Sequence, residues 1–181
     1  MALITSMLLL AVITVLAVGM FRSFSVQEQI AGNLREKQRA LHAAVTAQQY
    51  AEWWMTQGNN VATAPIACNS LLDAKLNQGQ ICTSKVTNVT SPPWKVGSAD
   101  VGVTYNPGPG SGSMQITQTA IGRDTYWQVP RFHIAHIGAS ADGSGEIYQV
   151  DAVGYGSTPN AVAVVESTFV VKAGVVDRGG P

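Results

Sequence analysis

The first 21 residues of the chain contain no charged side chain, and this run limits the possible folds more than any other feature. Only Thr5, Ser6 and Thr14 interrupt a series of apolar residues. An α-helix rises about 1.5 Å per residue, so about 20 such residues cross the hydrocarbon core of a bilayer. The run therefore predicts a hydrophobic helix, assigned to residues 1–25, that spans a membrane or packs in the core of a fibre.

Residues 26–57 predict an amphipathic continuation of the same helix. The segment contains charged residues, lacks proline and stops at Gly58, a good helix terminator. Steps of mostly four residues define an apolar stripe. The stripe consists of Val26, Ile30, Leu34, Leu41, Val45 and Met55, and Ala31, Ala44 and Ala51 fill the gaps in it. We expect Tyr50, Trp53 and Trp54 in the core between this helix and a sheet.

The distal part of the chain is rich in turns and in β-branched residues. Residues 58–98 predict a connector, residues 99–173 an antiparallel sheet, and residues 174–181 a flexible tail. Glycine-rich turns separate the expected strands, which is typical of a meander. These strands are residues 100–105, 114–121, 125–137, 146–155 and 161–172. Pro130 lies inside one of them and should mark an edge or a bulge.

The charge balance excludes several kinds of partner. Eleven basic and eleven acidic residues cancel, so no basic patch for a nucleic acid is expected. Charged residues make up only 12% of the chain, below the usual ~25% of soluble domains. A surface of low charge suits a protein that is largely covered by its neighbours.

Two cysteines, Cys68 and Cys82, lie 14 residues apart beyond the apolar run. In a small exported domain this spacing predicts one disulfide closing a short loop, which is worth roughly 3 kcal/mol. Two unpaired buried thiols are the alternative. The few Cys and His residues do not fit a structural zinc site.

No group of residues predicts catalysis, a cofactor, a metal or a small-molecule substrate. His133 and His136 are three apart, so on a strand they point to opposite faces. Residues 106–113 are rich in glycine but have no lysine and no following helix, unlike a phosphate loop. Residues 142–146 lack the alternating oxygen ligands of an EF-hand.

The amino terminus lacks the basic region that opens a secretory signal peptide. We therefore expect that a short basic leader has been removed and that Met1 is the mature terminus. An ordinary initiator methionine is the alternative.

Residues 27–37, followed by three alanines, resemble the amino-terminal signature of the PilX-type minor pilins of type IV pili. Residues 148–169 are similar to the last two strands of that family. The resemblance implies an α+β type IV pilin fold, in which a long N-terminal helix packs on a C-terminal antiparallel sheet. The signature residues here are Ala31, Gly32, Asn33, Leu34 and Arg35.

The same resemblance implies a non-enzymatic subunit, cut by the prepilin peptidase after a glycine and N-methylated at Met1. Such a subunit resides in the inner membrane, with its distal domain in the periplasm, before it enters the extracellular fibre. Its implied partners are other minor pilins, the major pilin and a large tip adhesin. Its implied roles are priming of pilus assembly, cell adhesion and twitching motility.

Thr5 departs from the general pilin pattern, which places a glutamate at the fifth mature position. A buried carboxylate in an apolar bundle needs a charge partner, which in a fibre is the amino terminus of the subunit ahead. A subunit with Thr5 makes no such pair, so we expect it at or near the tip. A tip pseudopilin of a type II secretion system and a single-pass membrane-anchored binding domain remain alternatives.

Overall fold

The computed structural model describes most of the chain. The described residues are 2–58, 60–62, 64–68, 81–86, 88–92, 94–96, 99–100, 102–105 and 126–172. The expected strand 114–121, the glycine-rich residues 106–113 and the expected tail 174–181 lie outside them. The chain divides into an N-terminal unit, Met1–Glu36, and a C-terminal unit, Lys37–Pro181.

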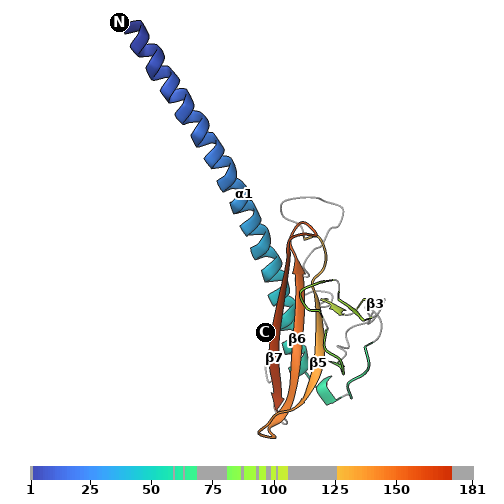
Figure 1. The fold of residues 1–181 in the computed structure, drawn as a ribbon. Helices are drawn as coiled ribbons and strands as arrows, with labels where there is room; N and C mark the ends of the chain where they lie inside the picture. Colours follow the sequence, from blue (N-terminus) through green and yellow to red (C-terminus); the bar gives the residue numbers. More distant parts are fainter. Residues whose placement is uncertain are drawn as a thin grey trace. The chain divides into compact units, whose positions relative to one another are not determined.

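One helix, α1 (Ala2–Thr56), accounts for most of the described residues before position 60 (Figure 1). It contains no proline, so no backbone hydrogen bond is lost along its 55 residues. It ends where Gly58 adopts a φ of 53°, a left-handed conformation that glycine takes without a steric penalty. The Asn60 amide then donates a 2.7 Å hydrogen bond to the Trp54 carbonyl, which satisfies one acceptor of the last turn. A short 3-10 helix, Asn60–Ala62, follows.

A five-stranded sheet and a two-stranded ribbon follow α1. The strands are, in chain order, β1 (Ile81–Cys82), β2 (Lys95–Val96), β3 (Ala99–Asp100), β4 (Val103–Thr104), β5 (Arg131–Ala139), β6 (Gly145–Tyr155) and β7 (Val162–Lys172). The ribbon pairs β2 with β3. In the sheet the order is β1-β5-β6-β7, and β4 pairs with another part of β5. The predicted combination of one long N-terminal helix with a C-terminal β-sheet is confirmed.

Strands β5, β6 and β7 form the expected antiparallel meander, with a register shift between His136 and Gly138. The sheet as a whole is mixed, because β1 pairs with β5 in parallel. Strand β5 begins at Arg131, so the expected start at residue 125 was wrong. Pro130 immediately precedes the strand, where its missing N–H costs no ladder bond, and its carbonyl accepts a 2.9 Å bond from the Tyr105 N–H.

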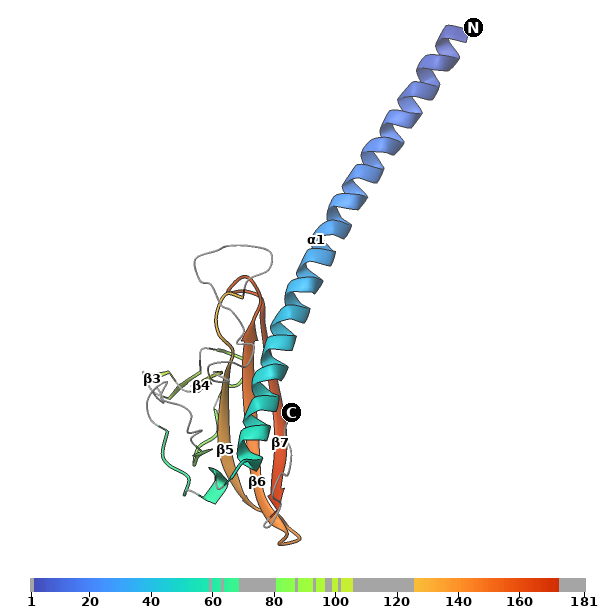
Figure 2. The same cartoon turned by 180° about the vertical axis from the view of Figure 1, so that it is seen from behind.

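Within the C-terminal unit, α1 lies along one face of the sheet (Figure 2). The side chains that make this contact are mostly small. The buried residues of α1 are Ala40, Ala43, Ala44, Ala47, Ala51, Trp54 and Met55. The core beneath them adds apolar residues of the sheet, among them Phe132, Ile134, Tyr148, Val150 and Ala152. Alanines let a helix backbone approach a sheet closely.

The expected apolar stripe is partly wrong as a description of the buried face. Leu41 is 47% exposed, whereas the alanines around it are completely buried. Met55 belongs to the core. Of the aromatic residues expected there, Trp54 is buried, Tyr50 is partly buried against the core and Trp53 is 44% exposed. The face of α1 that is buried is therefore the one whose small side chains let the helix backbone approach the sheet closely, and not simply the most hydrophobic face.

Polar contacts also hold this part of α1 to β7. The Lys37 ammonium donates to the Val162 carbonyl at 3.1 Å. The Ser167 hydroxyl donates to Glu52 Oε1 at 2.7 Å, and the Gln48 amide donates to the same oxygen at 3.0 Å. Hydrogen bonds to a charged group are among the stronger ones in proteins, so Glu52 fixes the helix against β7.

The opposite face of the sheet, the outer face, packs against Val86, Val89 and Trp94, which follow strand β1 in the chain. We call residues 64–68, 81–86, 88–92 and Trp94 the outer cover. Trp94 packs with Val153 and Tyr155 of β6, and Val86 and Val89 complete this second core. The Trp94 Nε1–H donates a 2.8 Å bond to the Val89 carbonyl, so the buried indole has a partner.

Candidate assembly interface

Residues 2–21 expose an unusual amount of apolar surface. Leu3, Val15 and Phe21 are each more than 70% exposed, and the other large side chains of this segment lie close behind. Among the described residues, α1 is the one helix long and apolar enough to cross a membrane. A contiguous apolar surface of this kind marks a membrane or protein contact, because monomeric soluble proteins rarely expose it to water.

The three polar side chains in this segment are satisfied inside the helix. The hydroxyls of Thr5, Ser6 and Thr14 donate to carbonyls three residues earlier, at 2.9, 2.9 and 2.8 Å. Hydroxyls bonded in this way carry little penalty in lipid or in an apolar bundle. Thr5 therefore brings no charge and no unsatisfied donor into the apolar surface.

The predicted signature residues 31–35 lie on α1 and are exposed. Met1, the expected processed and methylated terminus, lies outside the described residues. Within the part of the chain that the structure describes, Ala31, Gly32 and Asn33 stay exposed, so their side chains are accessible to other molecules.

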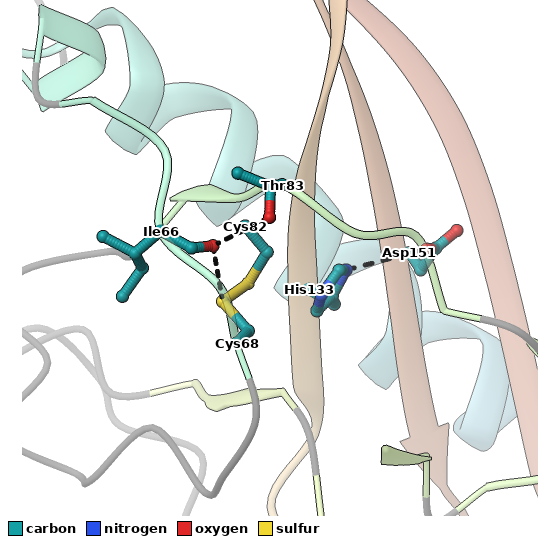
Figure 3. The surroundings of a disulfide bond; sticks show 6 residues. All are labelled: Ile66, Cys68, Cys82, Thr83, His133 and Asp151. Carbon is teal, nitrogen blue, oxygen red and sulfur yellow. Dashed lines mark hydrogen bonds and ion pairs between the residues drawn. A yellow bond between two sulfur atoms is a disulfide. The ribbon is translucent and has the colours of Figure 1, made fainter. Parts of the chain in front are cut away.

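Cys68 and Cys82 form a disulfide with Cα atoms 5.4 Å apart (Figure 3). Both residues are buried. Backbone bonds reinforce the link, since the Ile66 N–H donates to the Ile81 carbonyl and the Thr83 N–H to the Ile66 carbonyl, both at 2.9 Å. The disulfide thus ties two segments of the outer cover together beside β5.

A buried polar pair lies on the outer face next to this disulfide (Figure 3). His133 of β5 is 2% exposed and Asp151 of β6 is completely buried. They are direct cross-strand partners, with His133 Nδ1 and Asp151 Oδ2 3.9 Å apart. Neither of these two atoms has a hydrogen-bond partner within the described part of the chain, and the same holds for Arg131 Nε nearby on β5.

Burial shifts both protonation equilibria of this pair. It lowers the pKa of His133 from 6.5 to about 4, because the imidazolium is poorly solvated there. It raises the pKa of Asp151, an effect that a 3.0 Å bond from the Gln149 amide and the charge of Lys85 partly oppose. Glu166 on β7 adds to the rise. The pair therefore resists holding charge.

His136 is on the other face of β5, as the three-residue spacing predicts. Its ring contacts Tyr148 of the helix-side core, with ring centres 5.4 Å apart. Its Nε2 lies 2.8 Å from Glu146 Oε2. The two strand histidines therefore do not converge on one ligand.

The turn between β5 and β6 uses its acidic residue locally. Asp142 Oδ1 accepts bonds from the Ser144 backbone N–H at 3.0 Å and the Ser144 hydroxyl at 2.8 Å. Hydrogen bonds from Ser140 and Ser144 lower the pKa of Asp142 to about 2. No group of three or more His, Cys, Asp or Glu side chains suited to a metal occurs among the residues that the structure describes.

Residues 1–52 match the family model described as PilX N-terminal. The match covers the exposed apolar segment, the signature residues and most of α1, so this part of the chain is similar to a PilX-type type IV pilin. No curated protein and no solved structure matches the chain. The sheet and the outer cover are therefore interpreted from their own geometry.

Sequence reasoning missed two features of the C-terminal unit. Gly154 of β6 lies against α1, where a Cβ would collide with the Ala40 carbonyl oxygen and the Ala44 nitrogen. The glycine in an otherwise β-branched strand was the available signal. The pairing of His133 with Asp151 depends on strand register, for which the sequence has no direct signal.

Proposed function

We propose that this protein is a minor pilin of a type IV pilus, a structural subunit without catalytic activity. The observation that carries the proposal is the exposed, charge-free surface of residues 2–21 on a helix whose sequence matches the PilX N-terminal model. Before assembly this surface is solvated by the inner membrane. In the fibre it packs against the helices of other minor pilins and of the major pilin.

The energetics favour a one-way transfer. Exchange of lipid for other apolar helices is close to neutral, because lipid tails are as apolar as leucine. Exposure of the extracted segment to water instead costs tens of kcal/mol at about 25 cal/mol per Å². The subunit therefore stays in the fibre unless assembly machinery returns the helix to lipid.

We further propose that the subunit helps to prime assembly and lies at or near the fibre tip, between the shaft pilins and a tip adhesin. Thr5 supports this position, because its internally bonded hydroxyl offers no carboxylate to a subunit ahead. A subunit that needs no charge partner ahead of it fits the first place in a fibre.

Sheared filaments from cells that express a tagged protein test the proposal. We expect the protein to co-purify with filaments and gold labelling to mark filament ends. Leu9→Arg should abolish co-purification, because a central charge costs about 2.5–3.5 kcal/mol in an apolar helix environment, whereas Leu9→Met should not. Labelling spread evenly along shafts would refute the tip position, and absence from all filament and assembly fractions would refute the minor pilin assignment.

A further inference from the structure

The buried pair of His133 and Asp151 has no structural explanation in the assembly role proposed above. Two polar side chains, one 2% exposed and one fully buried, face each other at a distance too long for a hydrogen bond. Buried polar atoms are nearly always satisfied, and each exception destabilises the fold. A fold that keeps such a pair keeps a local source of instability.

That instability is located under the outer cover. His133 lies one residue before the short β5 stretch Ile134–Ala135 that pairs with β1. Lys85 of the cover lies close enough for its charge to act on Asp151. Figure 3 shows the chain from Cys82 and Thr83 close to the pair. The cover therefore is the element whose removal would give these groups access to water.

Within the described residues, the cover joins the ladder of the sheet over a short stretch only. It pairs with β5 through the two residues of β1, whereas β6 pairs with β7 along all eleven residues of each strand. Local opening follows the segments with the fewest backbone bonds and apolar contacts. Ile81 of β1 packs in the helix-side core, so the part of the cover that follows β1 should open before that core unfolds.

We propose that His133 and Asp151 form a proton-linked latch, in which protonation of the imidazole releases the outer cover from the sheet. In the closed state the imidazole is neutral. In the open state it is solvated and binds a proton near its ordinary pKa of 6.5. Acid therefore favours the open state by binding to it.

The direction and size of the pH effect on opening follow from the difference in the pKa of His133 between the closed and open states. Burial lowers the pKa of closed-state His133 to about 4, so the stability of the closed state is complete above pH 6.5 and falls until pH 4. Between pH 7.5 and pH 5 this histidine alone raises the opening equilibrium constant about 30-fold. Asp151, with its raised pKa, takes up a proton in the closed state and reduces that factor.

Three other charged residues lie around the pair. Arg131 lies on β5, Glu166 is the cross-strand partner of Asp151 on β7, and Lys85 belongs to the cover. The comparison of wild-type protein with a His133 variant therefore separates the response of the pair from that of its neighbours.

Hydrogen exchange of the full-length, disulfide-intact protein in detergent micelles tests the latch. After correction for intrinsic rates, residues 81–92 should open more at pH 5 than at pH 7.5, by up to about 30-fold, while β6 and β7 stay protected. His133→Gln should abolish this increase, because glutamine does not titrate. The matched control His136→Gln, which alters the exposed pair on the other face, should retain it.

A direct titration covers the case in which His133→Gln fails to fold. In the wild-type protein, the NMR signals of the His133 ring should titrate near pH 4. A native His133 that titrates near pH 6.5, or an acid response of residues 81–92 that persists in a folded His133→Gln protein, would overturn the proposal.

Discussion

Substitution of Gly154 by alanine tests how α1 is seated on the sheet. The added Cβ would collide with two backbone atoms of α1, the Ala40 carbonyl oxygen and the Ala44 nitrogen, and would lie 2.8 Å from the Ala43 Cβ. Backbone atoms inside a helix cannot rotate away. The helix itself must move, and with it the buried alanines and Trp54.

The expected change in the free energy of unfolding is the balance of two opposing effects. Overpacking of a well-packed core costs typically 1–3 kcal/mol, and a helix shift adds lost contacts on both sides. Gly154 is not at a positive φ, so alanine brings no backbone strain and recovers about 0.4–1 kcal/mol of chain entropy. We expect a net loss of about 1–3 kcal/mol, or roughly 3–10 °C in Tm for a unit of this size.

Thermal unfolding of the full-length protein in detergent, followed by circular dichroism, measures this loss. Gly19→Ala is the matched control, because nothing lies within 4 Å of its Cβ position and alanine favours the helix. The double variant Gly154→Ala with Ala43→Gly removes the side-chain contact and leaves both backbone collisions, so it should not recover stability. An unchanged Tm for Gly154→Ala, or recovery in the double variant, would refute the proposed seating.

Three further predictions concern single interactions. Ser167→Ala removes the 2.7 Å bond to Glu52 and should cost about 1 kcal/mol in urea unfolding, whereas Thr168→Ala, at an exposed position, should cost almost nothing. Replacement of both Cys68 and Cys82 by serine should lower the free energy of unfolding by about 2–4 kcal/mol, measured by the same method. It should also raise hydrogen exchange mainly in residues 81–86. An equal rise in exchange across β6 would contradict a local role of the disulfide. The pKa of the Asp142 carboxyl, measured by NMR, should be about 2. Its stabilisation of the β5–β6 turn should therefore be complete above pH 3.8 and lost as the pH falls through 2. Ser144→Ala should raise this pKa, because it removes a hydroxyl that donates to the carboxylate.

The helix and the meander could be predicted because their signals are local. A proline-free segment of helix-forming residues ends at Gly58, and glycine-rich turns separate β-branched runs. Both signals act within a few residues of the structure that they determine. The connector gave no such signal, and the parallel pairing of β1 with β5 joins residues more than 50 positions apart.

The buried face of α1 could not be predicted from hydrophobicity alone. The sequence pattern includes Leu41, which is exposed, and omits Ala40 and Ala43, which are completely buried. The reason is Gly154, more than 100 residues later, which offers a surface flat enough for the helix backbone. A periodic pattern measures how apolar a face is and contains no information on how closely its partner can approach.

The exposed apolar surface of residues 2–21 could be predicted from the sequence, whereas the buried polar pair in the sheet could not. Residues 2–21 can be recognised in the sequence because they lack charged side chains, and this property does not depend on any partner. The pair of His133 and Asp151 exists only because strand register places them opposite each other. A one-residue slip would move every side chain of β5 to the other face, so no reading of either residue alone could find the pair.

The two halves of α1 carry different kinds of apolar side chain, which suits a helix that packs on one sheet and, in the proposed fibre, against several neighbours. Alanines and Gly154 allow contact at one short distance with one partner, and this fixes the helix on its sheet. Residues 2–21 carry larger and more flexible side chains such as Leu9 and Met20. Such side chains can fill spaces of different shapes. Exchanges among Leu, Ile, Val and Met should therefore be tolerated in residues 2–21, while any enlargement of the buried alanines displaces the helix.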